Sequence, residues 1–234
     1  MGNAFQVSVH MQKGKPPQIS ASGTSQHPIT SEEKKAFGLN DAKIKQGVGN
    51  NFGKEPSDVF LCDPTPWGDI YSRYGWEPVQ SVATVERYEV LGVSSEPLIL
   101  TTKRLQNHSN NKASFSAALT QQVSNTIETN WSQSHNVSMA QSISYNFIVN
   151  GKTSISYNGT WGRGGSKSET ITVGDHSGVE IKLNPGQSAR AVLSTKRSVV
   201  RIRVFYKVYL TGSVFANYCP TYKDHHFWNL DINE

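Results

Sequence analysis

The sequence predicts a mainly β protein with a short helix near the N-terminus. From Val79 onward, β-branched, aromatic and small polar residues alternate in runs that are separated by turn signals such as Asn184-Pro185-Gly186. Between Val200 and Leu210 the even-numbered residues are apolar or aromatic, and three of the odd positions are cationic. This alternation is typical of a half-buried strand with a cationic outer face.

The residues before Val79 are polar and punctuated by Gly and Pro, and they contain one clear helix signal. Thr30 followed by Glu33 forms a capping box, which predicts a short helix through about Phe37. Asn40-Asp41 predicts a second short turn, which the stretch 47–53, rich in Gly and Asn, is expected to break. We therefore expect two parts, an N-terminal region at residues 1–78 and a β module at residues 79–234.

Composition permits several kinds of partner and singles out none of them. The chain has 234 residues and a net charge of +5, which allows attraction to anionic membranes, acidic glycans or nucleic acid. No apolar run reaches the roughly 18 residues of a membrane helix. The first residues lack a cationic head and an apolar run, so we expect a soluble protein that is secreted or released without a signal peptide. Cys62 and Cys219 could be bridged or free.

Residues 136–161 carry one formal charge, Lys152, although the chain has 23 Lys+Arg and 18 Asp+Glu. From Ser124 to Asn146, eleven of the twelve even positions are polar, and the exception is Ala140. On the odd side, six of the seven residues from Val137 to Val149 are apolar, and the return arm keeps the same parity. The resulting apolar face consists of Val137, Met139, Ile143, Tyr145, Phe147, Val149, Ile155, Tyr157 and Trp161. This period of two predicts an amphipathic hairpin rather than a helix.

The turn of this hairpin lies at Asn150, Gly151 and Lys152. A two-residue Asn-Gly loop would place every apolar residue opposite a polar one on the same face. A three-residue loop, residues 149–151, restores apolar pairing, so we expect an odd loop length with Gly151 in the left-handed conformation. The expected pairs are Tyr145 with Ile155, Ile143 with Tyr157, and Met139 with Trp161.

Two environments fit one apolar face, one small polar face and almost no charge. The first is a solvated amphipathic hairpin that lies on a β body. The second is a strand pair of a transmembrane β-barrel, because each arm has about 10–12 alternating residues and a spanning strand needs roughly 9–11. An open hairpin leaves unsatisfied edges in lipid, so insertion requires several chains that close a ring.

Residues 63–78 concentrate aromatic side chains. They include Trp67, Tyr71, Tyr74 and Trp76. Rings with a polar tip suit a packed corner where a loop docks on a sheet, and they equally suit a platform for a sugar or a lipid headgroup. These four residues are therefore our candidates for receptor binding.

Three stretches, SNTIETNWSQSHNVSMAQSISYNF, SISYNGTWGRGGSKSETITVG and VEIKLNPGQSARAVLSTK, resemble the aerolysin-type β-pore-forming superfamily in its epsilon-toxin/mosquitocidal-toxin branch. With WGDIYSRYGW, SEPLILTTKRLQNHS and YKDHHFW, the chain looks most like spherulins and follicular-epithelium yolk proteins. The resemblance covers roughly residues 63–228. It implies an elongated fold of long twisted antiparallel strands, with an insertion hairpin at residues 124–173 that tucks against the body.

The resemblance also implies a function. The protein would bind a target membrane through a lipid or glycan receptor, form a homo-oligomer, and insert the hairpin of its pore-forming module as a β-barrel, in cytolysis or defence. We assign membrane or receptor binding to the N-terminal region, residues 1–78. The alternative is a non-lytic storage, structural or carbohydrate-binding protein on the same fold, as the spherulin and yolk relatives suggest.

No enzyme constellation stands out. GRGGSKS at 162–168 has Ser166 where a phosphate-binding loop needs Gly, and the adjacent His225 and His226 point to opposite faces of an extended segment. The cations Arg201, Arg203 and Lys207 lack the interleaved aromatics of a nucleic-acid site. We therefore expect no catalytic residues, no metal, no cofactor and no nucleic-acid partner.

Overall fold

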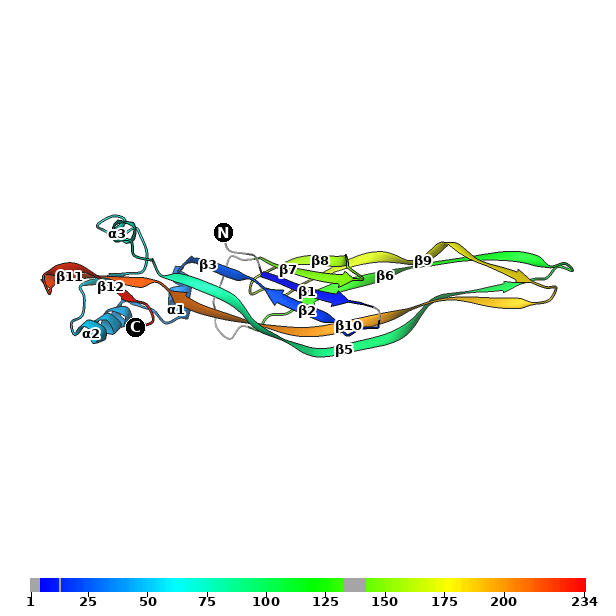
Figure 1. Cartoon of the computed structure of the whole chain (residues 1–234), viewed down its shortest axis with the longest axis horizontal. Helices are drawn as coiled ribbons and strands as arrows, with labels where there is room; N and C mark the ends of the chain where they lie inside the picture. Colours follow the sequence, from blue (N-terminus) through cyan, green and yellow to red (C-terminus); the bar gives the residue numbers. More distant parts are fainter. Residues whose placement is uncertain (1–4, 13, 133–141) are drawn as a thin grey trace.

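The computed structural model describes residues 5–12, 14–132 and 142–234 and shows an elongated molecule made mainly of β-strands (Figure 1). Helix α2 (Asp41–Phe52), helix α3 (Ile70–Tyr74) and strands β4 (Asp58–Phe60), β11 (Ser213–Tyr222) and β12 (His225–Asp231) gather at one end, which we call the head. The opposite end, the tail, consists of the loops 107–112 and 184–187 with the strand ends that they join. The predicted fold class is confirmed.

Two long ribbons connect these ends. Strand β5 (Gln80–Gln106) pairs antiparallel with β10 (Ser188–Thr211) along its whole length, and β3 (Thr24–Pro28) adds to the head end of β5. Strands β6 (Ala113–Thr129) and β9 (Gly165–Leu183) form the second ribbon. Near the tail the ribbons pack together through the buried side chains of Leu105, Ala117 and Leu183.

A four-stranded sheet lies beside the ribbons in the middle of the molecule. Its order is β2 (Gln18–Ser22), β1 (Phe5–Met11), β7 (Ser142–Val149) and β8 (Lys152–Thr160). Strand β1 runs antiparallel to β2 and parallel to β7. The alternation of Phe5, Val7 and Val9 signals β1 in the sequence, but we did not predict strands in this region. The division at residue 78 stays a prediction, and β1 and β3 pair with strands from beyond it.

A helix and a second short turn were predicted from local sequence signals, and the structure confirms the start of the first but not the early end of the second. Helix α1 (Ser31–Ala36) begins at the predicted capping box, with both reciprocal hydrogen bonds between Thr30 and Glu33. The predicted break at residues 47–53 is wrong, because α2 continues to Phe52 and ends where Gly53 takes a φ of 85°. Each interior Gly costs about 1 kcal/mol relative to Ala. Burial of Ile44 and Val48 in the head core offsets that cost.

Candidate functional site

The hairpin β7–β8 turns at Asn150 and Gly151, which have φ values of 49° and 80°. Val149 faces Lys152, so the loop has two residues and our prediction of an odd loop length is wrong. Asn-Gly favours this tight turn, in which both central residues take a positive φ. The register is corrected one step farther on, by a β-bulge between the pairs at Phe147 and Ile148 that leaves Ser154 without an opposite residue.

The bulge restores the apolar pairing that the alternation requires. Phe147 faces Ile155, Tyr145 faces Tyr157, and Ile143 faces Gly159, so the observed pairs differ from the predicted ones by two residues while the faces agree. Met139, from the third expected pair, lies outside the described residues. The β6–β9 ribbon also pairs odd residues with odd and even with even. Its arms and the hairpin therefore have matching faces and are suited to form one continuous amphipathic hairpin.

The apolar face of the hairpin packs on the body. Ile143 and Ile155 are buried, Trp161 is 9% exposed, and Tyr145 belongs to the same cluster in a partly buried position. The opposing surface is the inner face of the β5–β10 ribbon, formed by Val85, Ile202, Val204, Tyr206 and Val208. Phe147, Val149 and Tyr157 are half-buried, and Val137 and Met139 lie outside the described residues. An amphipathic hairpin whose one charge, Lys152, lies beside the turn is thus stored with most of its apolar side covered.

An aromatic cluster fastens the base of the hairpin. The ring of Trp161 lies 4.8 Å from that of Tyr206, 5.0 Å from that of Trp131 and 5.2 Å from that of Phe5, measured between centroids. Trp131, Tyr206 and Phe5 were missed as site residues. The signal was present, because Trp131 occupies an odd position of the alternating segment and Tyr206 an apolar position of β10.

One glycine makes room for the hairpin's own rings. Tyr145 and Tyr157 stack with centroids 5.9 Å apart, and a Cβ on Gly159 would lie 3.0 Å from the first ring and 3.2 Å from the second. Both distances are shorter than ordinary contacts, so a side chain at Gly159 would push the two rings away from the sheet. Gly159 therefore belongs to the stored form of the hairpin.

The outer edge of β7 is covered by the N-terminal strand. Seven residues of β1 pair with β7, from Phe5 with Ile143 to Met11 with Val149, and the Asn150 N–H donates to the Met11 carbonyl at 3.0 Å. Because these bonds occupy the edge of β7, this edge is free to pair with another strand only after β1 has left.

The aromatic candidates at the head divide into a surface pair, a packed ring and a core residue. Tyr74 is 50% exposed and stacks on the half-buried Trp76 with ring centroids 4.9 Å apart. Trp67 is 37% exposed, although its other side packs on Phe60, Phe215 and Phe227. Tyr71 is 2% exposed, so its side chain cannot reach a receptor, and the prediction that it contacts one is wrong. Trp67, Tyr74 and Trp76, which we call the head patch, remain candidates.

Tyr71 instead lies in the core of the head and hydrogen-bonds to backbone groups there. Its hydroxyl oxygen lies 2.8 Å from the Phe60 carbonyl and 2.9 Å from the Ser213 carbonyl, and it accepts the Phe215 N–H at 3.0 Å. Burial raises the pKa of this phenol above its usual value, so it stays protonated and able to donate.

Replacing Tyr71 with Phe should leave buried backbone groups unpaired. We expect Tyr71→Phe to lower the free energy of unfolding by about 1–3 kcal/mol, measured by urea denaturation. Tyr74→Phe is the matched control, since it removes a hydroxyl from an exposed ring and should change the free energy by less than about 0.5 kcal/mol. Equal effects of the two substitutions would contradict the assignment of Tyr71 to the core.

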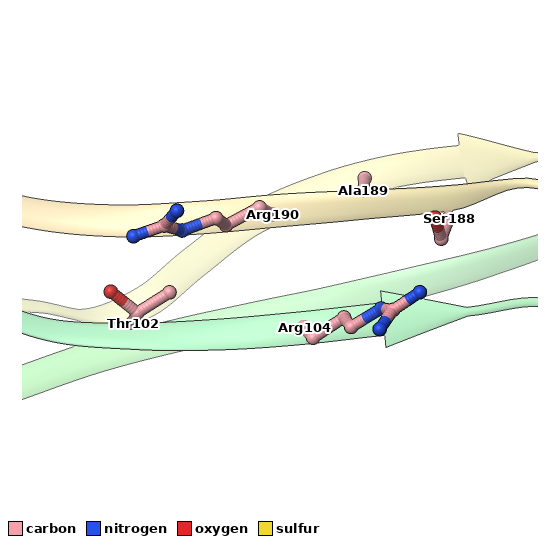
Figure 2. Close-up of a pocket in the computed structure, with 5 residues that line it drawn as sticks. All are labelled: Thr102, Arg104, Ser188, Ala189 and Arg190. Atoms are coloured by element: carbon pink, nitrogen blue, oxygen red, sulfur yellow. The ribbon is translucent and has the colours of Figure 1, made fainter.

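Outside the hairpin and the head patch, an open hollow lies on the outer side of the β5–β10 ribbon near the tail (Figure 2). Arg104 of β5 stands directly opposite Arg190 of β10 there, and their guanidinium groups point away from each other. Within the described ranges, no group of three or more His, Cys, Asp or Glu side chains is placed to hold a metal ion. Cys62 and Cys219 are free thiols.

In the same described ranges, no helix is long and apolar enough to cross a membrane.

Comparison with known proteins identifies the fold and the family of this chain. No protein-family model matches the chain. The Bacillus thuringiensis toxin parasporin-2, described as one that recognizes cancer cells, has a structure that matches 90% of this chain and 87% of its own with a TM-score of 0.55 at 17% identity. The fold is therefore aerolysin-like.

Two toxins from Megalopyge are similar in sequence. U-megalopygitoxin(8)-Mo12 of Megalopyge opercularis is 34% identical over 215 residues, which are 92% of this chain and 75% of the relative. U-megalopygitoxin(8)-Mc8 of Megalopyge crispata is 33% identical over the same shares of both chains. The chain therefore belongs to the U-megalopygitoxin(8) family.

Proposed function

We propose that the protein is a secreted, non-enzymatic pore-forming toxin that binds a target membrane, oligomerises and inserts the β7–β8 hairpin as part of a transmembrane β-barrel. The observation that carries this proposal is the stored hairpin. Apart from Lys152, which faces Val149 beside the turn, its apolar face carries no charge and is covered by the body, and its two arms follow β6 and precede β9 in the sequence with matching faces. The toxin names of the relatives and the fold of parasporin-2 support it.

The direction of the strands supports a route for insertion. Strand β6 runs from the tail toward the head, and the chain then reverses so that β7 runs beside β1 with the turn toward the tail (Figure 1). If β7 ran in the same direction as β6, the turn would lie toward the head. The head patch lies at this end, so binding through the head would place the released hairpin near the membrane.

Charges bound the segment that can cross the bilayer. On the return arm, no charged residue lies between Lys152 at the turn and Arg163. The ten residues 153–162 match the roughly 9–11 residues of a tilted membrane-spanning strand. Lys152 is exposed beside the turn, which emerges in water on the far side. The open edges of a single hairpin are unsatisfied in lipid, so several copies must close the barrel.

Dye release from vesicles made of target-cell lipid extract tests the proposal. We expect the protein to release a trapped dye and to form complexes of several copies that withstand mild detergent extraction. Heat-unfolded protein at the same concentration should release none. Vesicles that bind the protein and keep their dye at every concentration would overturn pore formation.

The head patch favours a second candidate function, a non-lytic carbohydrate-binding or storage protein, as in the spherulins and follicular-epithelium yolk proteins that the sequence resembles. Trp67 and Tyr74 present exposed ring surface beside the half-buried Trp76, and such rings suit sugars as well as lipid headgroups.

Removing rings from the head patch should separate binding from insertion. We expect the double substitution Trp67→Ala with Tyr74→Ala to lower binding to cells or glycans at least tenfold, measured by flow cytometry or a glycan array. Tyr209→Ala is the control, because Tyr209 is 37% exposed, like Trp67, but lies on β10. Unchanged binding of the double variant would remove the head patch as the receptor site.

A further inference from the structure

The middle of the β5–β10 ribbon is exposed on both strands and has open edges. Within the described residues, β10 pairs with no strand other than β5, and β5 has a second partner, β3, only between Gln80 and Thr84. Farther along, nearly every residue of β5 from Glu86 to Ile99 is exposed. Long open strand edges are sites where another chain can dock.

Exposed apolar side chains concentrate on β5 in this stretch. Ile99 is 61% exposed and Leu91 is 52% exposed. The other large apolar residues exposed there are Tyr88, Val90, Val93 and Leu98. Scattered exposed apolar residues are ordinary, but six of them within residues 88–99, distributed over both faces of one strand, mark a contact surface.

The charges of the ribbon divide between its two strands. Strand β10 contains six cations and no acid along its whole length. Strand β5 contains three acids, Glu86, Glu89 and Glu96, and three cations, of which Lys103 and Arg104 lie at the tail end, so its net negative charge is confined to the stretch between Gln80 and Thr102, where Arg87 is the cation. That cation pairs with Glu89, and its guanidinium lies 3.5 Å from the centre of the Phe205 ring. The ribbon therefore has an acidic edge on one side and a basic edge on the other.

Most of these charges have no ionic partner within the chain. In the part that the structure describes, none of the ion pairs involves Glu86, Glu96 or a cation of β10. At the tail end of the ribbon, Arg104 and Arg190 stand opposite each other with like charges (Figure 2). Farther along the ribbon Glu96 stands opposite Arg197 and Glu89 stands opposite Arg203, and such opposite charges attract within one chain. Lys196, Arg201 and Lys207 face no acid, so β10 keeps an excess of positive charge.

We propose that this ribbon is the subunit contact, in which the basic β10 edge of one copy lies against the acidic β5 edge of a second copy. The two edges lie on opposite sides of the ribbon. Each copy can therefore bind one neighbour through its β5 edge and another through its β10 edge, and the contact repeats in one direction. Such a head-to-tail contact closes a ring when the rotation between copies is right. This inference rests on the proposed function but adds its partner surface.

Side chains rather than backbone bonds carry the contact. Strand β5 has an extra residue relative to β10 at Glu86, Leu91 and Leu100, and it contains Pro97. Bulges and Pro protect an edge strand against indiscriminate pairing. The six exposed apolar residues and the acids of β5 are then the side chains that a second copy recognises.

Charge reversal on each strand provides the test. The β5 variant is Glu86→Lys with Glu96→Lys, and the β10 variant is Lys196→Glu with Arg201→Glu. We expect each variant alone to form at least tenfold fewer multi-copy complexes on vesicles than the unsubstituted protein, counted by mass photometry after extraction. An equal mixture should restore complexes that contain both variants. In each variant the substituted residues have the same sign of charge as the edge of the partner strand, and mixing does not change this within a chain. Rescue by mixing therefore comes from contacts between copies.

Controls separate this contact from folding, lipid binding and insertion. The control variant is Lys112→Glu with Lys182→Glu, which changes the net charge by the same amount as the β10 variant. Both lysines are exposed and lie outside the β5–β10 ribbon, so this variant should assemble normally. Melting temperatures should not change. If the mixture fails to assemble, or if either variant assembles alone, the proposal is wrong. Loss of binding to anionic vesicles by the β10 variant, without rescue by mixing, would assign β10 to lipid instead. Assembly without dye release would keep the contact and refute pore formation.

Discussion

A disulfide between β1 and β7 should abolish dye release, and reduction should restore it. Gln6 and Ser144 are paired residues of the two strands, and Gln6 is exposed, so Gln6→Cys with Ser144→Cys joins them outside the apolar core. Facing positions in a sheet satisfy the Cα separation of about 4.4–6.8 Å that a disulfide needs. The oxidised variant holds the hairpin against the N-terminal strand, so we expect its release to fall at least a hundredfold.

A second disulfide gives the matched control. Gln6→Cys with Ser22→Cys uses the same position of β1 but joins it to β2, which leaves β7 free. Both variants need Cys62→Ser and Cys219→Ser, because the native thiols are free and could exchange. We expect the control to release dye whether oxidised or reduced. Full release by the oxidised Gln6–Ser144 variant would show that the hairpin does not leave β1.

A cation on the apolar face of the hairpin should stop insertion, whereas the same cation on the polar face should not. Phe147→Arg places the charge on the odd, apolar face a few residues from the turn, and a cation on the lipid side of a barrel costs up to about 2–4 kcal/mol, the value at mid-bilayer. The cost recurs in every copy of the ring. We expect at least a hundredfold loss of release, with vesicle binding and oligomer formation retained.

The neighbouring residue supplies the control for this charge. Asn146→Arg adds the same cation to the even face, which would line the watery lumen, and release should change by less than about threefold. Both residues are half-buried in the stored form, so melting temperatures show whether either variant is unfolded. Equal loss in the two variants would contradict the assignment of faces.

The alternation in the sequence predicted the faces of the hairpin correctly but not its detailed register. The parity of residues 124–161 requires apolar residues to pair with one another, and the pairs of Tyr145 and Phe147 satisfy this requirement, whereas Val149 faces Lys152 beside the turn. Loop length and a bulge at Ser154 are two equivalent ways to shift a register by one residue, and parity alone does not distinguish between them. The strong preference of Asn-Gly for the tight turn was the signal that should have decided the matter.

Long-range partners were beyond reach from the sequence. Phe5, Val7 and Val9 alternate in the way a strand requires, but nothing in that short run says that it pairs with β7, more than a hundred residues away. The burial of Tyr71 depends on carbonyls from Phe60 and Ser213, which the fold brings together. Helix α2 likewise continues through its glycines because the head core buries Ile44 and Val48.

The N-terminal strand links storage of the hairpin with its release. Phe5 is fully buried against Trp161 and Tyr206, so β1 covers both the edge of β7 and part of the aromatic cluster at the base of the hairpin. Any event that removes β1 therefore weakens two contacts of the stored hairpin together. Loss of this strand should favour insertion, provided that the head patch and the subunit contact remain intact.

The central claim is that odd residues of the hairpin meet lipid and even residues meet water. An environment-sensitive dye on single cysteines at positions 144, 145, 146 and 147, in the background without native cysteines, measures this directly on vesicles. We predict that quenchers on the lipid acyl chains reach the dye at positions 145 and 147, and that aqueous iodide reaches it at 144 and 146. Quenching without this alternation, or dyes that stay in water at all four positions while the vesicles leak, would contradict the account.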